Sequence, residues 1–422
     1  MSYIGLIDDD DGNFKPADNW LRIKRDDPSL TNVAVYAHRY ARNQLDRLAF
    51  WLLSLNPRNN LVLTTTAEIE ELGRDIGNNT HLVRLVVMRD NIDESRRIFQ
   101  LLCEGINQNR SINRLHLNNQ CGREGLMFQF LNPFLENNNN LQQIIVHVYE
   151  LNSEGLCLLM APLMRRGTPL DLLALYQNSI DDGLVEELVA VFLENPALTP
   201  KNLNLRHNNF GRNGIDAIAR LLRDPRCTME GLDLSGNHIN NDSAIILADG
   251  LVRNNKLRKL NLDGTLITTA GFGFFSPCLC NRSSINATFS SNHTLQFLGH
   301  FYTHENVPAD VTAWIDYENP LHPMPADLQE YLEWNTNENK KIVARQKVFM
   351  QHFIRDFRMQ AFEGMDPDLL VSVLNFMDRA SSENNGVSNI NARHSILIRI
   401  LSQVLNNSLM IRTKLDGRNT CL

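Results

Sequence analysis

The chain repeats a leucine-based pattern every 28 to 30 residues through most of its length. The clearest copy runs from Met229 to Ile239 and places Leu232, Leu234 and Asn237 in the order L-x-x-L-x-L-x-x-N-x-L. Further copies start at residues 170, 200, 257 and 285, and looser ones start at 30, 58, 82, 112 and 141. The interval from 58 to 82 is only 24 residues, so the second repeat is shortened or out of register. A unit of 28 to 30 residues that recurs about ten times predicts a solenoid of stacked units.

Each copy supplies one strand and one helix. The L-x-L core alternates apolar residues with others, as a strand with one buried face does. Apolar residues at helical spacing follow, for example Ala244, Leu247 and Leu251. A residue at the Asn position, such as Asn237, can bond backbone groups that the turning chain leaves unpaired. We therefore expect an α/β leucine-rich-repeat horseshoe with an inner parallel sheet and outer helices, followed by a small all-α domain.

The end of the periodicity suggests the domain boundaries. Residues before about 30 carry the acidic run Asp8 to Asp11 and no strong pattern, so they are expected to be loosely ordered. Leucines at helical spacing predict a helix over Gln44 to Leu55, in the first repeat. The expected parts are an acidic segment 1–29, repeats 30–294, a Pro-containing connector 295–325, a helical C-terminal or capping domain 326–413 and a tail 414–422.

Composition narrows the class of partner and the compartment. The 422 residues carry a net charge of −7, which disfavours nucleic acid and acidic membranes as partners. Seven scattered cysteines indicate reduced thiols, and the N-terminus does not resemble a secretory signal. No apolar stretch reaches the roughly 20 residues of a membrane helix. We expect a monomeric, cytoplasmic protein, with the nucleus as the other compartment.

Two units carry a family resemblance, GLDLSGNHINNDSAIILADGLVRNN and NLNLRHNNFGRNGIDAIARLLRDP. They resemble the ribonuclease-inhibitor-like class of intracellular leucine-rich repeats. That class includes ribonuclease inhibitors, sensing ends of immune receptors and Ran GTPase-activating proteins, and the resemblance implies a protein that grips another protein. The segments NATFSSNHTLQFLG and MDPDLLVSVLNFM are similar to a group of uncharacterised algal leucine-rich-repeat proteins. The chain shows no GxxxxGK[ST] loop, no long acidic tail and no dense alternating Trp and Cys repeats.

The strand residues between the leucines are the candidate binding residues. They are expected on the concave face, where solenoids bind partners, and Arg, Tyr, Asn and His suit specific polar contacts. The alternative is an inner face that is only solvated. The candidate partner-binding residues are Arg84, Arg114, His116, Asn118, His147, Tyr176, Asn204, Arg206, Asp233, Lys259, Asn261 and Asp263.

The sequence contains only weak signals of a metal-binding or catalytic site. His300 and His304 stand at helical spacing, but a zinc site needs at least three placed ligands. Cys278 and Cys280 have no second pair, and GxSxG, GxGxxG and HExxH are absent from the sequence. We therefore expect no catalytic residue, no metal and no cofactor. The favoured function is a non-catalytic protein-binding scaffold. The alternatives are a GTPase activator resembling the Ran family and a function carried by the C-terminal helices.

Overall fold

The computed structural model describes residues 16–30, 32–39, 48–52, 61–63, 66–89, 96–119, 126–148, 150–281, 283, 287, 290–299 and 326–336. The chain divides into two compact units, 1–345 and 346–422, and every described residue belongs to the first. The expected connector beyond residue 299, the helical domain beyond residue 336 and the tail lie outside the described residues.

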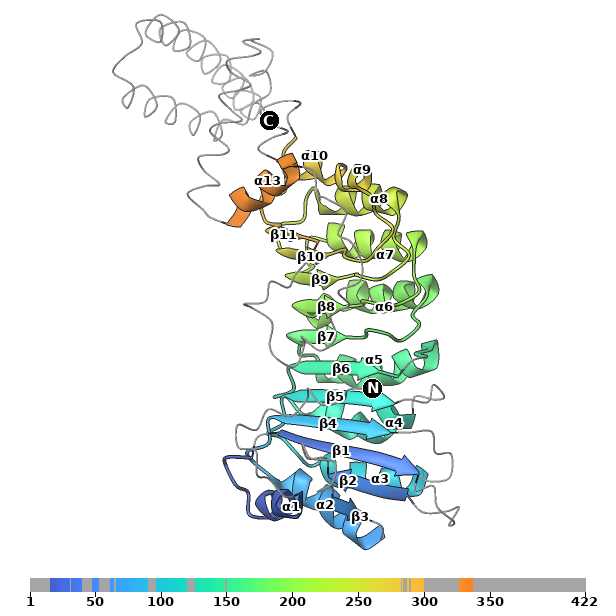
Figure 1. Ribbon diagram of the computed structural model, residues 1–422, viewed down its shortest axis with the longest axis vertical. Coiled ribbons are helices and arrows are strands. Elements are labelled where there is room, and N and C mark those ends of the chain that lie inside the picture. The colour runs from blue at the N-terminus through green and yellow to red at the C-terminus, as the bar shows by residue number, and fades with distance from the viewer. Residues whose placement is uncertain are drawn as a thin grey trace, which may run out of the picture. The chain divides into compact units, whose positions relative to one another are not determined.

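One sheet of eleven strands organises this unit, in the order β11-β10-β9-β8-β7-β6-β5-β4-β1-β2-β3 (Figure 1). The strands are β1 (Asn32–Arg39), β2 (Leu48–Leu52), β3 (Leu61–Leu63), β4 (Arg84–Arg89), β5 (Arg114–Asn119), β6 (Gln143–His147), β7 (Leu172–Ala174), β8 (Asn202–Asn204), β9 (Gly231–Asp233), β10 (Lys259–Asn261) and β11 (Phe297–Leu298). β1 and β4 to β11 run parallel, whereas β2 pairs antiparallel with β1 and β3. Parallel neighbours require a crossover, which the helix of each repeat supplies.

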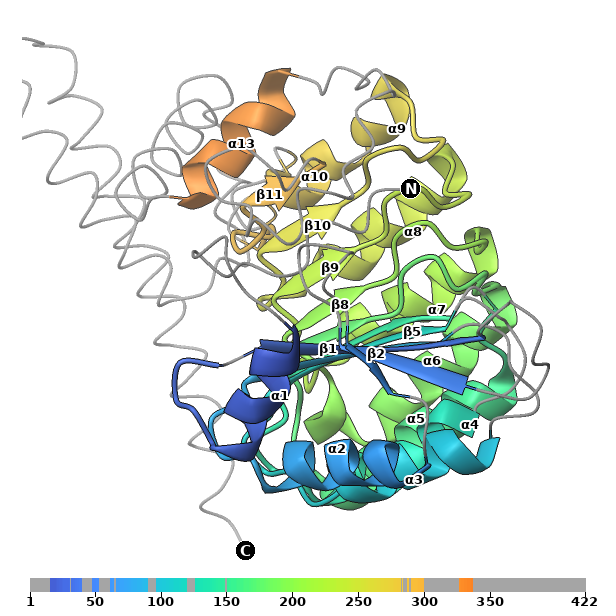
Figure 2. The ribbon, with the colours of Figure 1, turned by 60° about the horizontal axis from the view of Figure 1, so that its bottom comes forward.

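Helices α2 to α8 form an outer layer along one face of the sheet (Figures 1 and 2). The helices are α1 (Pro16–Lys24), α2 (Thr66–Asn78), α3 (Arg96–Ile106), α4 (Leu126–Asn137), α5 (Ser153–Arg166), α6 (Asp182–Glu194), the 3-10 helix η4 (Pro196–Leu198), α7 (Arg212–Arg223), α8 (Asn241–Leu251), α9 (Thr269–Phe272), α10 (Phe275–Leu279) and α13 (Ala326–Thr336). Asn152, Asp181 and Asn240 begin α5, α6 and α8, because each side chain accepts a bond from a backbone N–H three residues later.

The leucines of the repeat fill the space between the sheet and this helical layer. One row crosses seven strands in register, and each of its members is at most 2% exposed: Leu85, Leu115, Ile144, Leu173, Leu203, Leu232 and Leu260. Complete burial of such a side chain stabilises the fold by roughly 1.5 to 3 kcal/mol. The repeat therefore forms one continuous core, as the sequence predicts.

Asparagines at the last polar position of the template hold each turn to the next. Asn208 Oδ1 accepts bonds from the backbone N–H groups of Asn178 and Ile180, and its Nδ2 donates to the Leu175 and Leu205 carbonyls. Asn237 accepts in the same way from the Asn208 backbone. These amides satisfy buried backbone groups from two successive repeats, which confirms the role predicted for the Asn position.

A second series of asparagines lies where the helices lead back into the strands. Asn109 Nδ2 donates to the carbonyls of Ile76 and Asn79, and its Oδ1 accepts from the Ser111 and Ile112 backbone. Equivalent bonds recur at Asn79, Asn138, Asn254 and Asn292. The repeat template does not include these residues, and the structure shows that they form a second line of bonds between repeats.

The N-terminal edge differs from the expectation. Residues 16–24 form α1 instead of a loosely ordered segment, and Trp20 Nε1 donates to Asp75 of α2 at 2.7 Å. The helix expected over Gln44 to Leu55 contains strand β2, and the copy at residue 58 contributes antiparallel β3 rather than a stacked parallel repeat. Because β1 then pairs directly with β4, β2 and β3 extend the sheet at its edge.

The other end of the repeats also differs. Among the described residues the last parallel strand is β11, and its Leu298 stands beside Leu260, so the last described copy begins at Leu295 and not at residue 285. Asn335 of α13 donates to the Leu295 carbonyl at 2.8 Å and to the Asn292 carbonyl at 3.4 Å. Asn292 bonds Leu251 and Asn254 in the same manner. We therefore propose that α13 is the helix of the repeat that begins at Leu295, and that the boundary of the repeats lies after it.

Candidate functional site

The candidate site is the face of the parallel sheet opposite the helices (Figure 2). Successive side chains of a strand point to opposite faces. Because the leucine row points to the helices, the residues on either side of each leucine point to the opposite face. No described helix covers this face, and we call it the helix-free face. Pairing of adjacent strands then sets these residues in columns that run across the sheet.

The strand register defines three columns on the helix-free face. The first contains Arg84, Arg114, Gln143, Leu172, Asn202, Gly231 and Lys259. The second contains Val86, His116, Ile145, Ala174, Asn204, Asp233 and Asn261. The third begins with Met88, Asn118 and His147, and backbone bonds such as Gln177 N to Arg206 O extend it past the strand ends through Tyr176, Arg206, Ser235 and Asp263.

All twelve candidate residues lie in these columns, so the structure places them on one face. Their exposure is not what the sequence suggests. His116, Asn118, His147, Tyr176, Arg206, Asp233 and Asn261 are each at most 7% exposed. Arg114 and Lys259 are exposed, and Arg84, Asn204 and Asp263 are half-buried. Neighbouring strands lie about 4.8 Å apart, so side chains along a column pack against one another, and the accessible part of this face is smaller than the sequence predicts.

Aromatic and cationic groups stack along the third column. The rings of His147 and Tyr176 lie 5.5 Å apart between centroids, and the guanidinium of Arg206 lies 4.9 Å from the centre of the Tyr176 ring. Further along the sheet, Lys259 Nζ lies 5.6 Å from the Phe297 ring. Such contacts hold long side chains in place, so this part of the face is pre-organised.

The two histidines are neutral at physiological pH. Burial lowers the pKa of His116 to about 3, and the charges of Arg84 and of His147 lower it further. Burial likewise lowers the pKa of His147 to about 4, with a contribution from Arg206. The pKa of Asp233 moves in the opposite direction, because burial raises the pKa of its carboxyl. Hydrogen bonds from Ser235 oppose that rise.

Several polar atoms of this face have no hydrogen-bond partner within the described part of the chain. They are Nδ1 and Nε2 of His116, Oδ1 of Asn118, Nε of Arg206 and Oδ2 of Asp233. A buried polar group without a partner costs about 1 to 3 kcal/mol, and native proteins avoid that cost unless water or a ligand supplies the bond. These atoms are therefore the buried polar groups of this face for which water or a ligand would supply the bond.

Comparison with known proteins gives relatives for the repeats. A mouse protein named NACHT, LRR and PYD domains-containing protein 14 is 27% identical over 216 residues, which are 51% of this chain and 21% of that protein. The cattle NACHT, LRR and PYD domains-containing protein 3 is 24% identical over 209 residues, 49% of this chain and 20% of its own length. No family model matches the chain. The repeat in the sequence, the parallel sheet and the names of these relatives all indicate leucine-rich repeats.

The chain is a leucine-rich-repeat protein. It matches only about a fifth of the length of these two relatives, so their other domains say nothing about it. Among solved structures, an actin-binding site of leiomodin-1 covers 43% of the chain at 14% identity with a TM-score of 0.30. An internalin of Listeria monocytogenes covers 55% at 15% identity with a TM-score of 0.29. These scores are too low to support an argument.

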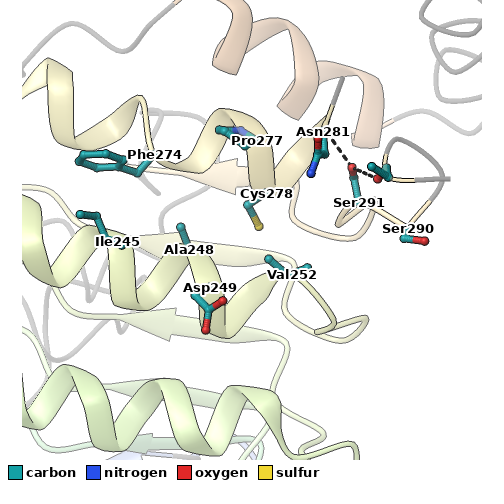
Figure 3. Close-up of a pocket in the computed structure, with 11 residues that line it drawn as sticks. Ile245, Ala248, Asp249, Val252, Phe274, Pro277, Cys278, Asn281, Ser290 and Ser291 are labelled. Carbon is teal, nitrogen blue, oxygen red and sulfur yellow. Dashed lines mark hydrogen bonds between the residues drawn. The ribbon is translucent and has the colours of Figure 1, made fainter. Parts of the chain in front are cut away.

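The leucine-rich-repeat protein also carries a hollow that the sequence did not reveal. An open cavity of about 310 Å³ lies in the outer layer between α8 and α10, with Ile245, Val252 and Phe274 at its rim (Figure 3). These three side chains are 39 to 46% exposed. Cys278 lines it too, and burial raises the pKa of that thiol to about 12. Apolar residues on the outer side of a repeat helix are the signal that could have located it.

The candidate metal and redox residues find no support in the described part of the chain. No group of three or more His, Cys, Asp or Glu residues that could hold a metal occurs among the described residues. Cys278 and Cys280 are buried, and neither forms a disulfide with a described cysteine. His300 and His304 lie outside the described residues. No described helix is long and apolar enough to cross a membrane.

Proposed function

We propose that this leucine-rich-repeat protein is a non-catalytic scaffold that binds a protein partner on the helix-free face of its sheet. The observation that carries the proposal is the strand register, which gathers twelve polar, charged and aromatic candidate residues in three adjacent columns. Proteins of leucine-rich repeats generally bind other proteins along such a face. In this chain we propose that the twelve candidate residues form the partner-binding surface.

The accessible residues of the face are the ones to test. Arg114 and Lys259 are exposed members of the first column, so changing them leaves the core intact. Arg114→Glu together with Lys259→Glu should abolish capture of the partner from a lysate of the producing cells. Arg253→Glu with Lys256→Glu changes the charge equally at exposed sites around the turn after α8, and should leave capture unchanged. Equal capture by both double variants would exclude the helix-free face.

The proposal extends to the kind of partner and to the state of the chain. A net charge of −7 supports a protein rather than nucleic acid or an acidic membrane as the partner. We also propose a monomer in the cytoplasm or nucleus, which light scattering and microscopy of the tagged chain check. The GTPase-activating alternative predicts faster GTP hydrolysis by a panel of small GTPases. We expect the purified protein to leave those rates unchanged.

A further inference from the structure

Four basic side chains form a diagonal line across the helix-free face, which we call the cationic belt: Arg84 on β4, His116 on β5, His147 on β6 and Arg206 beyond β8. The belt steps from the first column to the second and then follows the third. Tyr176 lies between its last two members, within 5.5 Å of the His147 ring and 4.9 Å of the Arg206 guanidinium. The belt is therefore a connected set of side chains.

Two guanidinium groups, those of Arg84 and Arg206, carry the positive charge of the belt, because both imidazoles are neutral at physiological pH. In addition to burial, Arg84 lowers the pKa of His116, and Arg206 lowers the pKa of His147. Burial raises the pKa of Asp233 on β9, and Arg206 is near enough to oppose that rise, so Asp233 borders the belt. An anion placed between β4 and β8 would thus lie between the guanidinium groups of Arg84 and Arg206.

Unsatisfied donors in the belt point to an oxygen ligand. A neutral imidazole always carries one N–H, so His116 has a buried donor with no partner among the described residues. Arg206 Nε is a second such donor, and both side chains are at least 94% buried. Asn118 Oδ1 is an unsatisfied acceptor in the neighbouring column. Carboxylate oxygens satisfy the donors, and a backbone N–H satisfies the acceptor, so an acidic peptide offers both.

The dimensions agree with a short extended segment. Four strand spacings separate β4 from β8, or about 19 Å at 4.8 Å each. An extended peptide rises roughly 3.3 Å per residue, so about six residues cross the belt. We propose that the helix-free face binds an extended acidic peptide segment of the partner along the cationic belt. This inference rests on the proposed function and specifies its ligand.

The test uses the full chain and labelled octaglutamate, with octalysine and octaglutamine as comparison probes. Octaglutamate should bind in low salt and lose affinity as salt rises, whereas octalysine and octaglutamine should not bind. Arg84→Gln, at a half-buried site, should weaken octaglutamate binding roughly fourfold, the size expected for one partly exposed charge pair. Arg253→Gln removes an exposed charge in the turn after α8 and should change the affinity for octaglutamate by less than about twofold.

A second readout locates the probe without a substitution in the buried part of the belt. With 13C-labelled histidine rings, octaglutamate should shift the His116 and His147 signals and leave exposed His238 unchanged. Absence of octaglutamate binding, equal binding of octalysine, or shifts confined to other histidines would overturn the inference. Loss of partner capture by the Arg114 and Lys259 double variant, without octaglutamate binding, would refute the belt and keep the proposed function.

Discussion

Replacing Asn208 by Ala should destabilise the protein far more than its size suggests. The Asn208 amide is the partner, among the described residues, of the Asn178 and Ile180 N–H groups and of the Leu175 carbonyl. The Leu205 carbonyl keeps a second donor, Asn237 Nδ2. Three buried backbone groups therefore lose their bond, at about 1 kcal/mol each. We expect the free energy of unfolding to fall by about 3 kcal/mol.

The next residue provides a matched control. Asn209 is exposed, and its backbone N–H, which Ala retains, donates to Ile180. Asn209→Ala should change the free energy of unfolding by less than about 0.5 kcal/mol. Denaturant titration followed by circular dichroism measures both variants. Because repeats can unfold separately, hydrogen exchange at the Asn178 and Ile180 amides gives a local measure, and both amides should exchange faster in Asn208→Ala. Equal stability of the two variants would refute the reasoning.

Three further predictions concern other parts of the structure. The pKa values of His116 and His147 are low in the folded protein, so only the unfolded chain takes up protons on these rings as the pH falls below 6.5. The free energy of unfolding should therefore drop by about 1 kcal/mol per ring between pH 7.5 and 5.5. The total drop should be smaller in His116→Asn, which has lost one of the two rings. Gly105→Ala would set a Cβ against the Gly73 backbone of α2 and should lower the melting temperature, whereas Gly183→Ala in α6, with nothing closer than 3.5 Å, should not. Thiol labelling at pH 8 read by mass spectrometry should modify exposed Cys157 while leaving buried Cys278 unmodified until unfolding, because its pKa of about 12 keeps it protonated.

The regular middle of the repeat could be predicted from the sequence because its rules are local. Leu203, Leu232 and Leu260 occur at fixed intervals and pair in register as the template requires. Asn208 and Asn237 hold the turns for the same reason. The columns of the candidate site follow from this register, which is why all twelve candidate residues lie on one face.

The edges could not be predicted because tertiary pairing decides them. Leucines from Leu45 to Leu55 fit a helical period, yet the apolar run Leu48–Leu52 fits a buried strand equally well, and pairing with β1 selects the strand. A longer final repeat moves its start from residue 285 to Leu295, which a fixed period misses. Burial of His116 and Arg206 depends on neighbours from other strands, so no single repeat reveals it.

The most direct test of the account is photo-crosslinking from the helix-free face in the producing cells. A photo-reactive amino acid would replace Arg114 in the first column and, in a second variant, Arg253 after α8; both positions are exposed. The account predicts that the probe at position 114 captures one protein partner and that the probe at position 253 does not. Capture of the same partner only from position 253 would contradict it.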